Sequence, residues 1–439
     1  MLRSLALLVS LAVLAPPAST TAQERLTLAD AISRARGVSA EARAAAAAER
    51  EAAERVPQAR AGYLPRVDVT ESWQRGDQPV FAFGSLLNQR RFTAADFAID
   101  RLNHPEAITN WRTGLVVEQL VFDGGMTRAG VRSAELGRDA ATLLRAQTGR
   151  DLAVAVTEAY GGVLQLEALR RSAAAGVDAA AEDLKVARLR REAGLVTDAD
   201  VLALEVHASA MREQQIRADA EAQVARDRLN HLMGAPLEAA FELDPAPPAA
   251  AFPDASGALE TEALHNRPEV KLAAIEERLA AEAQSTARAA FLPQLAFQGV
   301  FELNGETVPS QVSSWVVGAQ VRLNLFRGLA ARARLAEVTE TRIRRAAERE
   351  RAASLVRLDV RAALARLDAA RARETVGRAS VAQARESHRI IRDRYESGMA
   401  DVADLLRAAQ TVMSAESQAI AARVDVLVQS AALDRALGR

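Results

Sequence analysis

The side chains that could take part in covalent or metal chemistry are few, and they are not arranged for it. The chain contains no cysteine, which excludes disulfides, thiolate metal sites and thiol nucleophiles. Adjacent carboxylates such as Glu276 and Glu277 lie in charged helical runs typical of a solvated surface. The five histidines show no metal-ligand spacing: His104, His207, His231, His265 and His388. These patterns predict neither an enzyme nor a resident metal or cofactor.

A glycine-rich turn, VFDGGMTRAG at residues 121–130, follows a strand-like stretch and precedes a helical one. Such an arrangement can hold a dinucleotide, but the glycine spacing does not fit the GxGxxG fingerprint. A second copy of this segment, around Gly328, lacks most of the glycines. With a net charge of −1, the chain also gives no general case for nucleic acid. Neither nucleotide nor nucleic-acid binding is expected.

The elements that would position any site occur twice along the chain. Trp111 recurs as Trp315, an offset of 315 − 111 = 204 residues, and the offset persists without a gap to the C-terminus. It relates Gly114 to Gly318, Phe122 to Phe326, Gly124 to Gly328, Gly194 to Gly398, Asp200 to Asp404 and Gly234 to Gly438. A repeat this long indicates a duplicated structural unit. Any fold must therefore use each element of the repeat twice.

Long helices are predicted to fill most of each copy. Residues 125–193 and 329–397 contain no proline, and a continuous helix of ~70 residues would be ~100 Å long. Each stretch ends at a marked turn, EAGLVTDADV in the first copy and ESGMADVADL in the second. We expect Gly194 and Gly398 to end the outgoing helices, and Asp198 and Asp401 to cap the returning ones. The sequence thus predicts two helical hairpins with tight tips.

Four stretches break the helical pattern with alternating residues: 66–75, 111–122, 294–303 and 315–326. Each is long enough to cross a bilayer as a tilted strand. Such a stretch also fits a soluble sheet, but four in paired order behind a signal-like N-terminus favour an outer-membrane barrel. The alternation assigns Glu118 and Arg322, equivalent residues of the two copies, to the barrel lumen. Because four strands cannot close a barrel around a channel, several chains must contribute strands.

The N-terminal residues 1–22 are typical of a signal peptide, with Arg3 before an apolar run and Ala22 as a cleavage point. The first repeat is predicted over 23–235, with a β-hairpin at 66–122 and a tip at 194–198. A proline-rich linker follows at 236–260. The second repeat is predicted over 261–439, with a β-hairpin at 294–326 and a tip at 398–402. The predicted fold class is mostly α with membrane β-strands.

Together these patterns resemble the TolC-like outer membrane efflux proteins, over essentially all of the mature chain. The segments that carry the resemblance are Tyr63-Leu64-Pro65, Phe122-Asp123-Gly124-Gly125, Arg267-Pro268-Glu269-Val270, Phe291-Leu292-Pro293 and the two tips. The resemblance implies a homotrimer in the outer membrane of a Gram-negative bacterium, with a twelve-stranded barrel and a periplasmic helical tunnel. It also implies a passive exit duct for small molecules or proteins, opened at its tips through a periplasmic adaptor and an inner-membrane pump.

The resemblance implies roles for particular residues as well. The adaptor would contact the tips at Gly194, Leu195, Val196, Thr197, Gly398, Met399, Ala400 and Asp401. A periplasmic gate would use Asp404 as a ring aspartate, and Asp200 with Tyr395 as a pair that restrains the inner hairpin. Two positions depart from the family pattern: Ala400 replaces an arginine of the closing network, and Arg407 stands where a second ring aspartate can occur. The aperture is therefore expected to attract cations less strongly.

A periplasmic coiled-coil adaptor or spacer of an export complex is the alternative function, because adaptors also contain long helical hairpins. An adaptor would be expected to place one hairpin among β-rich domains. The duplicated tips and the two bilayer-length strand pairs argue against that alternative.

Overall fold

The computed structural model of the chain describes residues 24–244 and 256–439. The predicted signal peptide and much of the predicted linker lie outside these residues. Four long helices dominate: α5 (Met126–Glu192), α6 (Asp198–Met233), α9 (Ala330–Glu396) and α10 (Val402–Leu437). The shorter helices are α1 (Leu28–Val38), α2 (Ala40–Arg60), α3 (Pro79–Asn88), α4 (Ile99–Asn103), α7 (Ser256–Asn266) and α8 (Pro268–Ala289). The chain is thus mostly helical, as its sequence predicts.

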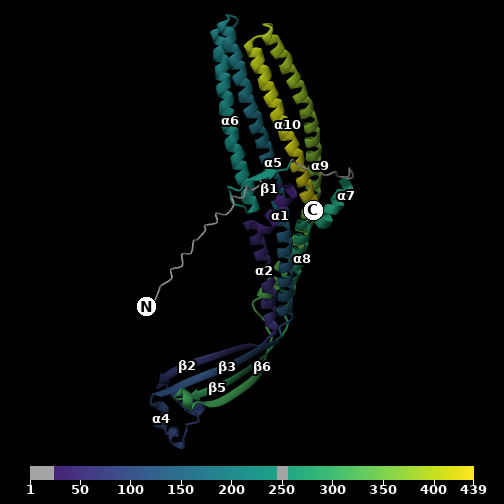
Figure 1. Ribbon diagram of the computed structural model, residues 1–439. Helices are drawn as coiled ribbons and strands as arrows, with labels where there is room; N and C mark the ends of the chain where they lie inside the picture. The colour runs from purple at the N-terminus through teal and green to yellow at the C-terminus, as the bar shows by residue number, and fades with distance from the viewer. Residues whose placement is uncertain (1–23, 245–255) are drawn as a thin grey trace, which may run out of the picture. The chain divides into compact units, whose positions relative to one another are not determined.

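The helices reproduce the sequence duplication residue for residue. α5 and α9 each contain 67 residues, and α6 and α10 each contain 36. All four pairs of helix ends differ by 204, as in 330 − 126 and 396 − 192. Figure 1 shows α5 with α6, and α9 with α10, as two helical hairpins.

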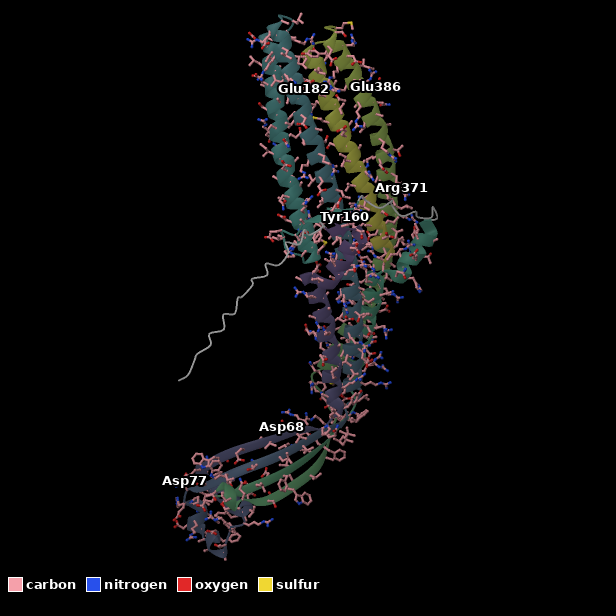
Figure 2. The ribbon with its side chains drawn as sticks, viewed as in Figure 1. Asp68, Asp77, Tyr160, Glu182, Arg371 and Glu386 are labelled. Atoms are coloured by element: carbon pink, nitrogen blue, oxygen red, sulfur yellow. The ribbon has the colours of Figure 1, made fainter. Side chains whose placement is uncertain are left out.

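The chain divides into two compact units, and each is described by itself. The first contains residues up to Ser39, 152–250 and 370–428, including both tips. Its core gathers Leu26 and buried side chains of α1, α5 and α6 around Tyr160 (Figure 2), including Ala31, Val156, Val163, Leu229 and Met233. A two-stranded parallel sheet, β1 (Glu24–Leu26) with β4 (Phe241–Leu243), lies against this core.

Tyr160 ties that small sheet to the core of the first unit. Its hydroxyl oxygen lies 2.9 Å from the Leu26 carbonyl oxygen and 2.8 Å from the Asp244 carbonyl oxygen. Its side chain has no exposed surface, and burial raises the pKa of Tyr160 to about 12. The sequence did not predict β1 and β4, because three-residue strands beside a proline-rich stretch carry too little alternation to be recognised.

α5 is the one helix among the described residues that is long and apolar enough to cross a membrane, with a mean hydropathy of 1.2 over its best window. Length and composition alone cannot distinguish such a helix from a packed core helix. In α5 the apolar residues Val156, Ala159 and Val163 are buried in the core of the first unit. Packing in this core therefore uses part of the apolar surface of this helix.

The second unit contains residues 40–151, 251–369 and 429–439. Its four-stranded antiparallel sheet has the order β2-β3-β5-β6, and Figure 1 shows it as a curved ribbon. The strands are β2 (Arg66–Gly76), β3 (Ile108–Phe122), β5 (Gln294–Gly305) and β6 (Val312–Arg322). The alternating pattern predicts a fourth strand that continues to Phe326, but β6 ends at Arg322. Residues 323–326 lie beyond its last pair, Gln294 with Arg322, so they have no partner in the ladder.

Candidate functional site: the helical tips and the two-faced sheet

Both tips end their outgoing helix in the same way. Gly194 has a φ of 72° and Gly398 a φ of 75°, a left-handed conformation that residues with a Cβ rarely adopt. The Gly194 amide donates to Arg191, and the next amide reaches back to Arg190, each at 2.9 Å. The second tip repeats this pattern, with Gly398 donating to Tyr395 at 3.0 Å and Met399 to Arg394 at 2.8 Å. Glycine therefore allows each chain reversal to be completed in a few residues.

The returning helices begin with different capping residues. At the first tip Thr197 is the N-cap, and it forms a capping box with Asp200. The sequence-based prediction that Asp198 caps this helix is wrong, because Asp198 is its first residue and forms an ion pair with Arg191 at 2.5 Å. At the second tip Asp401 accepts a hydrogen bond from the Asp404 amide at 2.8 Å, as a capping residue should.

Each turn presents one large apolar side chain to solvent. Leu195 is 69% exposed and Met399 is 65% exposed, and these residues are equivalent in the two copies. Val196 instead packs against a small core of Ala187, Val201 and Leu204. A rigid turn with an exposed apolar apex is suited to contact another protein.

The four predicted gate residues all lie near the tips, but they form two separate arrangements. Asp200 accepts hydrogen bonds from the Thr197 amide at 2.9 Å and from the Thr197 hydroxyl at 2.7 Å. These bonds lower the pKa of Asp200 below its ordinary value. Arg407 donates to the Asp404 carboxylate at 2.9 Å, one turn away on α10. Asp404, the predicted ring aspartate, therefore has a cation beside it.

Tyr395 is 9% exposed, and its hydroxyl has no hydrogen-bond partner among the residues that the structure describes. Burial raises the pKa of Tyr395, although the charge of Arg190 opposes this shift. The guanidinium carbon of Arg190 lies 5.3 Å from the centre of the Tyr395 ring. The structure thus pairs Tyr395 with Arg190, whereas the carboxylate of Asp200 is engaged by Thr197.

Arg190 is the tip residue that sequence reasoning missed. It extends from α5 to the end of α9, where it donates to the Tyr395 carbonyl at 3.2 Å and to the Glu396 carbonyl at 3.4 Å. The last carbonyls of a helix carry partial negative charge, which favours a cation there. An ion pair between Asp183 of α5 and Arg392 of α9, at 3.5 Å, joins the same two helices.

The strand pairing separates the sheet of the second unit into two faces. Directly opposed residues of antiparallel strands share a face, so Glu118 shares one with its partners Arg66 and Gln298. The charged members of this polar face are Arg66, Asp68, Arg112, Glu118, Glu302 and Arg322; Asp68 is labelled in Figure 2. The opposite face is mostly apolar and contains Val67, Val69, Trp73, Trp111, Leu115, Val117, Phe297, Phe301, Trp315, Val317 and Val321, with two charged residues of β2, Glu71 and Arg75.

Charges on the polar face are balanced, with three arginines and three carboxylates. Arg112 forms an ion pair with Glu302 across β3 and β5, and Arg66 contacts Asp68 at 2.8 Å. Glu118 accepts a hydrogen bond from Gln298 at 3.4 Å. The predicted lumen residues Glu118 and Arg322 therefore lie on one face, as the alternation requires. A sheet with one polar and one apolar face is suited to separate water from lipid.

A profile of the family described as outer membrane efflux protein matches residues 31–235 and 259–439, one segment for each copy. No curated protein sequence matches the chain significantly. Among solved structures, the outer membrane protein VceC from Vibrio cholerae is 18% identical, with a TM-score of 0.77 over 94% of this chain and 96% of VceC. The CmeC outer membrane channel of Campylobacter jejuni is 15% identical, with a TM-score of 0.80 over 94% and 85%. The MtrE channel of Neisseria gonorrhoeae, solved in an open state, is 19% identical, with a TM-score of 0.72 over 94% and 88%.

These structures share the fold of this chain, and the family match covers both copies of its repeat. The protein therefore belongs to the outer membrane efflux protein family, whose members are transport ducts of the outer membrane and not enzymes.

Proposed function

We propose that three copies of this chain form a passive duct through the outer membrane, with a twelve-stranded barrel and a tunnel of periplasmic helices. The duct is the exit path of a tripartite efflux or type I secretion system. An inner-membrane pump supplies the cargo, small molecules or proteins, and a periplasmic adaptor couples the pump to the duct.

The sheet of the second unit is the observation that carries this proposal. Its apolar face is suited to lipid and its polar face to water, yet β2 and β6 each have an edge that no described strand pairs with. Unpaired backbone groups are very costly in a bilayer, so each edge needs a partner strand. Pairing β6 of one copy with β2 of the next satisfies every edge once the ring closes. Three copies give twelve strands, an even number in the range of bacterial barrels.

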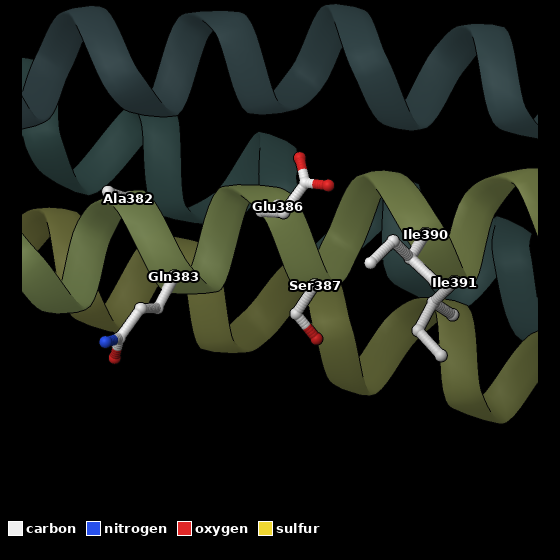
Figure 3. A pocket seen from close by; sticks show the side chains of 6 residues that line it. All are labelled: Ala382, Gln383, Glu386, Ser387, Ile390 and Ile391. Atoms are coloured by element: carbon white, nitrogen blue, oxygen red, sulfur yellow. The ribbon is translucent and has the colours of Figure 1, made fainter.

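A further exposed surface fits the same assembly. Six residues of α9 line a shallow hollow on that helix: Ala382, Gln383, Glu386, Ser387, Ile390 and Ile391 (Figure 3). Ile390 is 45% exposed, although an apolar side chain of this size is favoured in a packed interface. In the proposed trimer a neighbouring copy covers this face of α9.

The tips are the proposed contacts for the adaptor and the proposed position of the gate. Leu195 and Met399 provide exposed apolar contacts, supported by Gly194, Val196, Thr197, Gly398, Ala400 and Asp401. Asp200, Tyr395, Asp404 and Arg407 are the proposed gate residues, and the geometry adds Arg190 to them.

The assembly is tested by measuring the mass of the protein extracted from outer membranes in detergent, using light scattering with the detergent contribution subtracted. We expect a protein mass of three chains.

A cysteine scan then tests the proposed pairing of β6 with β2 of the next copy, because the chain has no cysteine of its own. Thr70→Cys on β2 is combined in turn with cysteines on β6, and we expect disulfide-linked trimers for the pairs in register. A monomer, or a protein recovered only from the soluble periplasm, would instead support the adaptor alternative.

A further inference from the structure

The two β-hairpins differ in length, and the duplication allows this difference to be counted in residues. β5 begins 294 − 66 = 228 residues after β2, but Trp315 follows Trp111 by only 204 residues. The first hairpin is therefore 24 residues longer than the second, and the added length lies in its connection. This connection, residues 77–107, is called the mouth segment below. It lies at the end of the sheet away from η1 (Ala61–Tyr63) and α5, which adjoin the other ends of β2 and β3.

The mouth segment is folded and has its own small core. It contains α3, α4 and the 3-10 turn η2 (Ala94–Phe97). The rings of Phe83, Phe92 and Phe97 pack edge to face, with centres 4.8 to 6.4 Å apart. Thr93 and Asp96 form a capping box, and Arg101 contacts Asp96 at 3.2 Å. Such contacts give the segment a defined shape.

A buried chain of amides attaches the mouth segment to the polar face of the sheet. Gln89, directly after α3, donates to the Asn110 side chain at 3.0 Å and to the Thr109 carbonyl at 2.8 Å. Asn110 of β3 donates in turn to Asn304 of β5 at 2.9 Å. All three amides are at most 5% exposed. Asn304 is the strand partner of Arg112, which places this chain of amides on the polar face.

Two arginines after α3 extend the attachment across the sheet. Arg91 forms an ion pair with Glu306 at 2.5 Å, and Arg90 donates to the Ser313 carbonyl of β6 at 3.1 Å. Arg90 has a φ of 56°, a left-handed conformation that is costly for a residue with a side chain. The surrounding contacts hold this strained turn in place. The segment therefore contacts β3, β5 and β6 rather than extending away from the sheet.

From this geometry we infer that the mouth segment is a second constriction of the duct, at the end opposite the helices, which limits the size of what can pass. The inference rests on the proposed function, in which the polar face lines the passage. A twelve-stranded barrel is roughly 25 Å across between backbones, from a strand spacing of ~4.8 Å and a tilt of about 40°. A helix with its side chains is about 10–12 Å wide. Three copies of α3 on the inner wall would therefore fill most of that opening.

Cysteine labelling from outside intact cells tests this inference. Gln298→Cys places a thiol on the polar face, seven residues inward from the end of β5 at Gly305. Two probes are compared, a small maleimide and a polyethylene-glycol maleimide wider than a helix. We expect the small probe to react and the large probe to be excluded. Deleting residues 80–103, which removes the 24 additional residues, should admit the large probe and raise its labelling rate at least about tenfold, as removal of a steric block would.

Point variants separate the attachment from the bulk of the segment. Gln89→Leu removes both hydrogen bonds that this side chain donates to β3, at similar volume. It should raise labelling by the large probe about tenfold, because those two bonds no longer hold the segment. The matched control is Gln311→Leu. Gln311 also bonds to β3, donating to Thr113 at 3.1 Å, but it belongs to the short connection of the second hairpin. This control should leave both labelling rates unchanged.

The outcomes distinguish this inference from the function on which it rests. Phe297→Cys, on the apolar face beside Gln298, should not react with either probe, because it faces lipid. The constriction would be overturned, and the duct left intact, by a different result. In that result the small probe reacts, and the large probe reacts equally with the unmodified and the shortened protein. Failure of the small probe to react in the shortened protein would overturn the water-filled passage itself, and the constriction with it.

Discussion

At the scale of single residues, Arg190 links the first hairpin directly to the second at the tips. It is half-buried, and it contacts both the last carbonyls of α9 and the face of the Tyr395 ring. Hydrogen bonds to a charged group contribute about 1.5–3 kcal/mol, and a cation over an aromatic ring adds about 0.5–1 kcal/mol. In a duct that closes at its tips, these contacts favour the closed arrangement.

We therefore expect Arg190→Ala to raise the open fraction of single channels in planar bilayers. A loss of about 1.4 kcal/mol would change the ratio of open to closed channels about tenfold. Arg394→Ala is the matched control, because Arg394 is the equivalent residue of the second copy and is exposed. Equal conductance records for Arg190→Ala and the unmodified protein would remove Arg190 from the gate.

A conservative change of Tyr395 separates two arrangements of the gate. The family resemblance pairs its hydroxyl with Asp200, but in this chain the hydroxyl has no described partner and Asp200 caps a helix with Thr197. Tyr395→Phe should therefore leave the open fraction unchanged, because the ring that faces Arg190 remains. A raised open fraction would show instead that the hydroxyl forms a bond in the assembled duct.

In the proposed gate, the pair formed by Asp404 and Arg407 sets the ion selectivity. Because the two side chains are in contact, the positive charge of Arg407 offsets the negative charge of Asp404. Arg407→Ala should make the duct more cation-selective, which is measured as a shift in reversal potential across a salt gradient. The control is Arg217→Ala, which removes the i,i+4 ion pair with Glu213 on α6 away from the turn. An unchanged reversal potential would place Asp404 away from the aperture.

At the scale of elements, the two strand-to-helix junctions differ in how they are capped. Before α5, Asp123 accepts hydrogen bonds from the Gly125 amide at 2.9 Å and the Thr127 amide at 2.6 Å. The equivalent residues before α9 are Arg327, Leu329 and Ala331, which cannot reproduce that cap. Leu329 nevertheless keeps the left-handed conformation of Gly125, with a φ of 64°. The second junction has lost its cap and also retains a strained backbone.

Replacing Leu329 with glycine should relieve this strain. The left-handed conformation costs about 1–2 kcal/mol for a residue with a side chain, and glycine loses part of that gain through a more flexible unfolded chain. Since Leu329 is 64% exposed, little packing is lost. Leu329→Gly should therefore raise the free energy of unfolding by about 0.5–1 kcal/mol, measured by denaturation in detergent. The reciprocal change Gly125→Leu should lower it, and stabilisation by both changes would contradict this explanation.

At the scale of the whole molecule, assembly in a membrane requires each face of the sheet to meet the correct solvent. Val300 and Phe301 are neighbours near the middle of β5, but Val300 belongs to the polar face and Phe301 to the apolar face. Phe301→Arg should cost about 2–4 kcal/mol, the usual cost of an arginine facing lipid near the membrane centre. Val300→Arg is the matched control and should assemble normally. The yield of trimer from outer membranes measures both, and equal yields would mean that the apolar face does not meet lipid.

Periodicity and duplication are sufficient to predict the long helices, their tips and the polar face of the sheet. The exact offset of helix ends follows from a repeat without gaps, and Glu118 and Arg322 follow from the alternation of strands. Contacts between elements are less accessible from sequence. Arg190 and Arg394 occupy equivalent positions in the repeat, and only the packing of α5 against α9 shows that Arg190 is the one that bridges the hairpins. Likewise, Thr197 and Asp198 are both suitable N-caps, and the partner Asp200, three residues after Thr197, explains why Thr197 is used.

The equal lengths of the duplicated helices indicate where this chain tolerates insertions and deletions. One added residue in α5 would advance everything beyond it by about 1.5 Å and rotate it by about 100°. The turn at Gly194 would then be displaced relative to the turn at Gly398. The side chains of α5 beyond the insertion would also leave the face on which they now pack. The connections between strands carry no such constraint, and the first hairpin is 24 residues longer than the second. Length variation in this architecture is therefore expected to accumulate at the ends of the strands, while the helices keep their number of residues.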